Sequence, residues 1–333
     1  MKTRVRFHDH KPRELSLADT VIDGLSRANK AIPPKFLYDQ RGSQLFDAIC
    51  DQPEYYLPRA ERGLLNRLSG EIGRLAGRQR TVFEPGAGSL SKIRLLLEPL
   101  LPCCYVPMDI SADYLQDAAH NLSRDYPWLD VHATCVDFTH SIPLPEQLPD
   151  RHRLAFFPGS SLGNFEPTEA QQFLAMVQQR LGANGMLLIG VDTKKSARVL
   201  NAAYNDEAGV TAEFNLNLLK RLQRELSAVL EVDQFAHHAF YNEQQSRIEM
   251  HLVSRRAQTL CIGDHCFEFK AGESIHTENS YKYSPDEFLA LARRAGFRPV
   301  DYWLAEQDSF ALYLLEVSER TDWHWPSPSP EAQ

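Results

Sequence analysis

Residues 81–88, Thr-Val-Phe-Glu-Pro-Gly-Ala-Gly, join a short apolar run to two closely spaced glycines. Glycines at the end of a strand let the backbone pass close to a flat ligand, as the first turn of nucleoside-binding α/β folds requires. A dinucleotide site normally has a third glycine, but Ser91 occupies that position and Lys92 follows it. Glu84 also suits the cationic amino group of a methionine moiety better than a phosphate. On the glycines alone, Gly86 and Gly88 leave three interpretations open: S-adenosylmethionine (SAM), a dinucleotide, or an ordinary tight turn.

Acidic residues follow two further apolar runs. Asp109 ends the run at 105–110 and lies 23 residues after Gly86, the distance at which a carboxylate on the second strand meets the ribose hydroxyls of a nucleoside. Asp137 and Phe138 end the next run and suit an adenine, since a carboxylate can accept from the exocyclic amine beside an aromatic face. Helix capping by the aspartates and core packing of the phenylalanine are the competing interpretations.

The composition describes a globular chain of 333 residues, with 43% hydrophobic and 24% charged residues. Its net charge of -8 argues against nucleic acid as the main partner and favours a small-molecule substrate. Neither a secretory signal nor a membrane-spanning run is recognisable, so we expect a cytoplasmic protein. The histidines and cysteines lack metal-ligand spacing, which predicts no metal, and we expect reduced, mostly buried thiols at Cys50, Cys103, Cys104, Cys135, Cys261 and Cys266.

Short apolar runs alternate with longer amphipathic ones, which predicts an α/β fold with a parallel sheet. Strands are expected at 105–110, 131–138, 154–157 and 186–192, with crossover helices around 90–97 and 173–181. A helix at 286–295 then precedes two strand-like runs at 299–304 and 310–317. This ending resembles the reversed last strand of the class I SAM-dependent methyltransferases, and it favours SAM over NAD.

Two segments do not belong to that sheet. Residues 1–60 precede it and residues 197–285 interrupt it, with helices expected at 197–204 and 212–230 and strands at 235–241, 247–254 and 266–270. An insertion of this length is no simple loop. We therefore predict a Rossmann-like SAM-binding domain (61–196 and 286–320), a second α+β substrate-binding lobe (1–60 and 197–285) and a flexible tail (321–333).

Seven separate strings carry a more specific resemblance, which covers about residues 15–318. They are IPPKFLYDQRGSQLF (32–46), PEYY (53–56), FPGSSLGNF (157–165), AYND (203–206), FNLN (214–217), IEMH (248–251) and TENSYKY (277–283). Together they resemble the L-histidine Nα-methyltransferases of ergothioneine biosynthesis. The resemblance implies three successive methylations of the histidine α-amine, which give the betaine hercynine.

The same resemblance implies roles for individual residues. Tyr55, Asn164 and Tyr204 would hold the carboxylate and amine of the amino acid, and Glu278 and Ser280 would meet its imidazole. The pocket around the amino acid would be completed by Met250, Gly159, Tyr38 and Phe46. The methyl donor would be bound by Gly86, Lys92, Asp109, Asp137 and Phe138. Tyr38, Asn164 and Tyr204 would orient the amine for catalysis.

These residue types also make chemical sense by themselves. Neutral imidazole has one donor and one acceptor nitrogen, so a carboxylate and a hydroxyl two residues apart on a strand face can bind both. Aromatic side chains suit an amine that ends as a quaternary cation. No side chain is an obvious general base, which predicts catalysis by alignment, with water taking the proton.

Several alternatives remain. A solvated strand face is the competing interpretation of Glu278 and Ser280, and core packing is that of the four aromatic residues. Related enzymes act on an imidazole nitrogen or on another amino acid, and a SAM-binding sensor without catalysis would need the same donor site. No long apolar surface demands a partner, so we expect a monomer.

Overall fold

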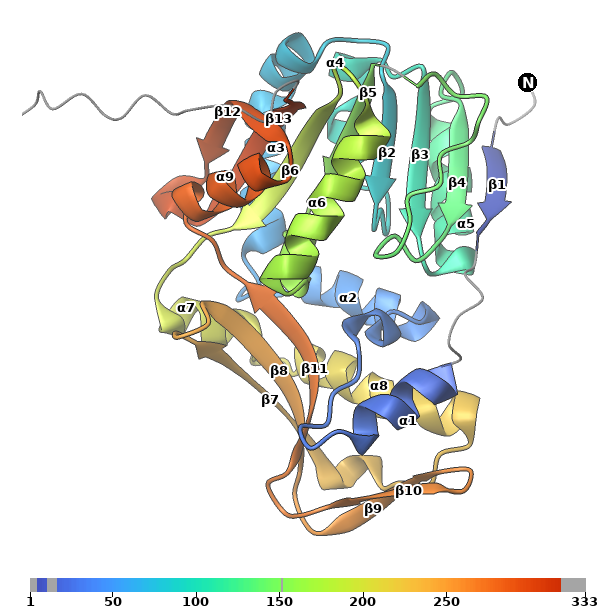
Figure 1. Cartoon of the computed structure of the whole chain (residues 1–333), viewed down its shortest axis with the longest axis vertical. Coiled ribbons are helices and arrows are strands. Elements are labelled where there is room, and N and C mark those ends of the chain that lie inside the picture. Colours follow the sequence, from blue (N-terminus) through green and yellow to red (C-terminus); the bar gives the residue numbers. More distant parts are fainter. Residues whose placement is uncertain (1–4, 11–16, 151, 319–333) are drawn as a thin grey trace, which may run out of the picture.

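The computed structural model describes residues 5–10, 17–150 and 152–318. Figure 1 shows a large α/β domain in its upper half and a smaller lobe below it, with helix α2 (Gln40–Cys50) between the two. The predicted tail, residues 321–333, lies outside the described residues.

An eight-stranded sheet forms the centre of the large domain, in the order β1-β4-β3-β2-β5-β6-β13-β12. Its strands are β1 (Val5–Asp9), β2 (Thr81–Pro85), β3 (Cys104–Asp109), β4 (Val131–Cys135), β5 (Arg153–Phe157), β6 (Met186–Asp192), β12 (Phe297–Leu304) and β13 (Phe310–Val317). Strands β1 to β6 run parallel, and β13 runs antiparallel to both β6 and β12. The predicted reversed last strand, and with it the class I methyltransferase fold, is confirmed.

Helices cover both faces of this sheet, because side chains alternate between two apolar clusters along each strand. In β2, Val82 belongs to the cluster under α3 (Leu57–Ala76), whereas Phe83 belongs to the cluster under α6 (Pro167–Leu181). The other large-domain helices are α4 (Leu97–Leu100), α5 (Ala112–Asp125) and α9 (Pro285–Arg294). No helix in the described parts of the chain is both long and apolar enough to span a bilayer.

The lobe combines helices with an antiparallel sheet of three strands in the order β11-β8-β7. These are β7 (Phe235–Asn242), β8 (Arg247–Ser254) and β11 (Ser274–Tyr281), beside a separate hairpin of β9 (Gln258–Ile262) and β10 (His265–Phe269). Its helices are α1 (Leu17–Ser26), α2, α7 (Ala197–Ala203) and α8 (Val210–Leu226). Figure 1 shows α8 running along the lobe near the three-stranded sheet. The predicted α+β character of this part is confirmed.

Two local predictions were wrong. Residues 5–9 were assigned to the lobe, but β1 pairs in parallel with β4 and extends the main sheet at its edge. The crossover helix expected around 90–97 is instead the short 3-10 turn Ile93–Leu95 followed by the single turn α4. Leu90, Ile93 and Leu97 are nevertheless fully buried, so the apolar spacing identified the buried side correctly.

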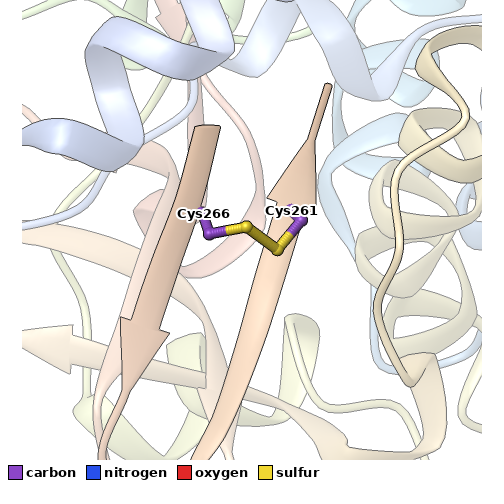
Figure 2. Close-up of a disulfide and its surroundings, with 2 residues drawn as sticks. All are labelled: Cys261 and Cys266. Atoms are coloured by element: carbon purple, nitrogen blue, oxygen red, sulfur yellow. A yellow bond between two sulfur atoms is a disulfide. The ribbon is translucent and has the colours of Figure 1, made fainter. Parts of the chain in front are cut away.

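The prediction that all six cysteines are thiols was also wrong. Cys261 on β9 and Cys266 on β10 form a disulfide, shown in Figure 2. The two residues are direct partners in the antiparallel register of the hairpin, so their side chains lie on the same face. Strand β9 was not expected from the sequence, and without it the spacing of the two cysteines has no structural meaning. Cys50, Cys103 and Cys104 remain thiols.

Candidate active site

The glycine loop after β2 takes a conformation that glycine favours. Gly86 and Gly88 have φ angles of 68° and 54°, and a Cβ atom on Gly86 would lie 3.2 Å from Cε1 of Phe138. Asp109, at the end of β3, accepts hydrogen bonds from the backbone N–H groups of Gly88 and Ser111, both at 3.0 Å. The structure thus brings together the glycines, Asp109 and Phe138 that the sequence predicted for the donor site. A side chain at position 86 would press on the ring of Phe138, so glycine is what lets the loop lie against that ring.

Asp137 follows β4 and meets a residue of the lobe. Its Oδ2 accepts from Lys35 Nζ at 2.9 Å, and its Oδ1 accepts from the N–H of Thr139 at 3.0 Å. Burial by itself raises the pKa of Asp137, but the bonds from Thr139 and Lys35 outweigh it and hold the pKa below its ordinary value. Phe138 packs edge-on against Phe157 with ring centroids 6.1 Å apart. The pair predicted for adenine is therefore an ionised carboxylate beside a fixed ring.

Glu84 lies beneath the loop rather than at its surface. It is buried on β2, and Tyr105 donates a hydrogen bond to its Oε2. Burial raises the pKa of Glu84 to about 8, against the opposing effects of Tyr105 and Lys92. A cofactor contact by Glu84 stays a prediction.

Lys92 and Gly159 meet at a buried carboxylate that the sequence did not reveal. Glu61 on α3 accepts from Lys92 Nζ at 2.6 Å and from the N–H of Gly159 at 2.9 Å. Glu61 is fully buried, and Gly190 on β6 leaves room for it, since a Cβ there would lie 2.1 Å from its Oε1. Gly159 has a φ of 83°, and its missing Cβ would sit 3.1 Å from Lys92 Nζ. Glu61 therefore fixes both predicted residues at the edge of the sheet.

Aromatic rings from both halves of the lobe form one cluster. Tyr38 lies 5.6 Å from Phe46 and 5.4 Å from Phe214, centroid to centroid. Tyr55 continues the cluster to Tyr204 at 5.8 Å. The structure thus brings together the four predicted aromatic residues and adds Phe214, which the sequence left unassigned. Most of the pairs meet edge to face, the arrangement that aromatic quadrupoles favour.

Glu278 and Ser280 lie on β11 in the order that the sequence suggested. A β-bulge between His276 and Glu278 sets the register, in which Glu278 pairs with Met250 of β8. Glu278 is buried, and its Oε2 has no hydrogen-bond partner among the residues that the structure describes. Burial raises the pKa of Glu278 to about 7, against the opposing effect of Lys282. A buried acceptor without a partner is costly unless a ligand supplies the donor.

Asn164 approaches the same strand from the large domain. It ends the 3-10 turn Ser161–Asn164, in which Gly163 comes so close to β11 that a Cβ would lie 2.7 Å from the carbonyl oxygen of Tyr281 and 3.4 Å from Ser280 Oγ. The turn can reach this position only because Gly163 has no side chain. Asn164 is thereby placed next to the residues predicted to bind the imidazole.

Tyr204 closes the group through its hydroxyl. It donates to Ser280 Oγ at 2.8 Å and accepts from Lys282 Nζ at 3.2 Å. Lys282 in turn lies 2.8 Å from Asp192 Oδ2, and neither side chain is exposed. Asp192 ends β6 and also accepts from Tyr56 and Lys195. Lys282, Asp192, Tyr56 and Lys195 therefore form a polar group beside Tyr204 and Ser280 of the predicted acceptor site.

A comparison with known protein families decides the assignment. The sequence profile of the family described as "Histidine-specific methyltransferase, SAM-dependent" matches residues 17–317. The chain belongs to this family. It is 38% identical over 306 residues to the histidine N-alpha-methyltransferase of Mycolicibacterium smegmatis, covering 90% of this chain and 94% of that protein. It is also 30% identical over 299 residues to ergothioneine biosynthesis protein 1 of Neurospora crassa, covering 87% of this chain and 33% of that protein.

In this histidine-specific methyltransferase, sequence reasoning missed a group of buried charges: Glu61, Asp192, Lys195 and Lys282. Glu61 lies in an amphipathic helix and carries no motif. Asp192 does end a strand, as Asp109 does, and this signal alone could have drawn attention to it. Lys282 stands two residues after Ser280, and alternation along the extended chain places the two on the same face.

One group of possible metal ligands exists among the described residues. Atoms of Glu249, His251 and His276 lie within 4.8 Å of one another. Glu249 Oε1 already accepts from Asn242 and Arg247, both at 2.9 Å. The two imidazoles stack with centroids 4.9 Å apart, so their in-plane lone pairs do not converge. Hydrogen bonding within the methyltransferase accounts for this group, and the expected absence of a metal stays a prediction.

Proposed function

We propose that the protein transfers methyl groups from SAM to the α-amino nitrogen of L-histidine, three times in succession, to give hercynine for ergothioneine biosynthesis. The observation that carries the choice of acceptor is the buried, unpartnered Oε2 of Glu278 beside the hydroxyl of Ser280. Together they offer an acceptor and a donor, which neutral imidazole matches. A ring without nitrogens would leave both groups unpaired, at a cost that explains selectivity for histidine.

The donor site is assigned to the edge of the sheet where parallel strands end. Asp109 accepts from the ribose hydroxyls, Asp137 and Phe138 hold the adenine, and Gly86 and Gly88 give the backbone its close approach. Lys92 and Glu84 complete the predicted set. The fit is supported by the close approach of the Gly86 backbone to the ring of Phe138, where a Cβ atom would lie 3.2 Å from Cε1. SAM, when bound, supplies a methyl group already activated by its sulfonium.

The acceptor site is assigned mainly to the lobe, and Asn164 and Gly159 reach it from the large domain. Tyr55 and Asn164 hold the carboxylate and the amine of histidine, and Tyr204 accepts from the amine with the lone pair that Lys282 leaves free. The walls are the aromatic residues Tyr38 and Phe46 with Met250 and Gly159. This division of labour is supported by the close approach of Gly163, the neighbour of Asn164, to Ser280 and Tyr281 of the lobe.

Catalysis in this proposal rests on alignment. An ammonium has no lone pair, so the amine must be neutral when its nitrogen faces the methyl group. Burial raises the pKa values of Tyr38 and Tyr55 well above the ordinary value for tyrosine, so both remain neutral phenols that orient the amine rather than accept its proton. Water takes the proton. Holding the reacting atoms in line contributes the main part of the rate enhancement.

We further propose a metal-free, monomeric, cytoplasmic enzyme. A monomer is supported because one chain supplies every residue assigned to the two sites. The thiols of Cys50, Cys103 and Cys104 suit a reducing compartment, whereas the Cys261–Cys266 disulfide does not.

Calorimetry tests the assignment of the acceptor. In the presence of S-adenosylhomocysteine, L-histidine should bind the native protein and bind Glu278→Ala at least about tenfold more weakly, since a charge-assisted hydrogen bond is lost. Glu249→Gln is a matched control, because Glu249 is equally buried on the neighbouring strand but points to the opposite face from Met250. Undiminished histidine affinity in Glu278→Ala would refute the recognition role.

A further inference from the structure

Lys282 is a buried cation that makes three hydrogen bonds next to the acceptor site. Its Nζ donates to Asp192 Oδ2 at 2.8 Å, to Ser280 Oγ at 2.9 Å and to Tyr204 Oη at 3.2 Å. An ammonium has three hydrogens, so all of them are used. Burial alone lowers the pKa of Lys282, but Asp192 and Tyr204 outweigh this effect and keep it above its ordinary value. Lys282 therefore stays a donor at any working pH.

The hydrogens of Lys282, Tyr204 and Ser280 determine which hydrogen bond these residues can offer to a ligand. The hydroxyl of Tyr204 donates to Ser280 Oγ at 2.8 Å, so Ser280 accepts two hydrogen bonds, one from Lys282 and one from Tyr204. A hydroxyl has two lone pairs and one hydrogen, and both lone pairs of Ser280 are now occupied. Its hydrogen is left over. If Ser280 donated to Tyr204 instead, both lone pairs of Tyr204 would be occupied, by Lys282 and Ser280, and none would be left for the amine. Substrate binding therefore selects the arrangement in which Ser280 keeps the free hydrogen.

We propose that Lys282 is a positioning residue that makes Ser280 an obligate hydrogen-bond donor to the unprotonated ring nitrogen of the substrate. The pocket then presents one donor at Ser280 and one acceptor at Glu278, and it selects a neutral ring that has both an N–H group and a bare nitrogen. The inference rests on the proposed function. It adds that Lys282, which lies outside the pocket wall and acts through Ser280, determines that the pocket offers a hydrogen-bond donor to one of the two ring nitrogens.

Asp192 is the buried carboxylate that pairs with Lys282. It is fully buried and accepts from Lys195 at 2.6 Å and from Tyr56 at 2.8 Å, in addition to Lys282. Lys195 forms no hydrogen bond with Ser280 or Tyr204 in the described part of the chain; its other partners are the hydroxyl of Tyr56 and the carbonyl oxygen of Thr193. Lys282 and Lys195 thus neutralise the same carboxylate, but of these two lysines Lys282 alone bonds the hydroxyls of Ser280 and Tyr204. This difference supplies a matched pair of variants.

The experiment compares two acceptors, L-histidine and a β-pyrrolylalanine whose ring keeps the N–H group and has a C–H group in place of the bare nitrogen. With the native protein, the pyrrole should be poorer in kcat/KM by about 100-fold, because the Ser280 hydrogen is left unpaired. Lys282→Met leaves space in which the hydroxyl hydrogens can turn toward Asp192. The preference for imidazole should then fall at least about tenfold, mainly through KM. Lys195→Met should keep the native preference.

Each possible result of this experiment either supports or overturns the proposal. A merely structural role for Lys282 would lower kcat/KM for both acceptors alike, and an unchanged preference in Lys282→Met would overturn the proposal. Because removing one partner of a buried ion pair can prevent folding, Asp192→Asn/Lys282→Met removes both charges and must show the same loss of preference. A native enzyme that accepts the pyrrole within about threefold of histidine would overturn the proposal without any variant. If the native protein methylated no histidine, the proposed function itself would be wrong.

Discussion

Replacing Glu278 by glutamine should make the protein more stable and less active at the same time. The structure buries this carboxyl without a partner for Oε2 and raises its pKa from 4.5 to about 7. Such a difference corresponds to about 3 kcal/mol of destabilisation once the group is ionised. Glu278→Gln keeps the shape of the protonated acid and removes that cost.

The pH dependence follows from the direction of this change. The native state binds the proton more tightly than the unfolded chain, so the free energy of unfolding falls as the pH rises from about 4.5 to about 7. Below this window the carboxyl is neutral in both states, and above it the full cost is present. The ligand-free variant should therefore melt several degrees higher than the native protein at pH 8, with a smaller gain at pH 5.5.

Thermal melts of the ligand-free proteins at the two pH values test this, and Glu249→Gln supplies the contrast. Burial raises the pKa of Glu249, but bonds from Asn242, Arg247 and His251 outweigh it and lower the pKa, so glutamine there should reduce stability at pH 8. The reasoning about Glu278 is refuted if Glu278→Gln melts lower than the native protein at pH 8, or if its gain is the same at pH 5.5.

Three further perturbations test other parts of the account. Asp109→Asn should raise the Kd for SAM by about tenfold in calorimetry, because a ribose acceptor oxygen becomes an amide donor; an unchanged Kd would contradict the assignment. Glu61→Gln should lower the melting temperature markedly, since it breaks a buried ion pair worth about 3 kcal/mol or more, whereas the exposed Glu71→Gln on the same helix should change little. Replacing Cys261 and Cys266 together by serine should cost about 2 kcal/mol of stability for this short loop and leave kcat unchanged; a loss of turnover would show that the hairpin matters for catalysis.

The donor site was predictable from the sequence because its residues obey a local rule. Gly86, Asp109 and Asp137 all follow apolar runs, and the carboxyl ends of parallel strands meet at one edge of a sheet. The spacing alone therefore places them together. The reversed strand β13 was predicted for a different reason, because a helix followed by two apolar runs at the end of the chain resembles the ending of the class I SAM-dependent methyltransferases.

The buried charges could not be predicted in the same way. Lys282 and Asp192 are 90 positions apart in the sequence, and Glu61 meets Lys92 across 31 positions, and no local pattern identifies the partner of either lysine. Such pairs depend on how the lobe packs on the sheet, which no local period encodes. The disulfide between Cys261 and Cys266 was missed because strand β9 was not recognised, and register decides which side chains meet.

The central claim, methylation of histidine at its α-amine, is tested most directly by mass spectrometry. The purified native protein is incubated with SAM and each of the common amino acids in turn, and the products are analysed for added methyl groups and for their position. The account predicts the gain of one, two and finally three methyl groups on L-histidine alone, all on the α-nitrogen. Methylation of a ring nitrogen, methylation of another amino acid in preference to histidine, or no methylation of any amino acid would contradict it.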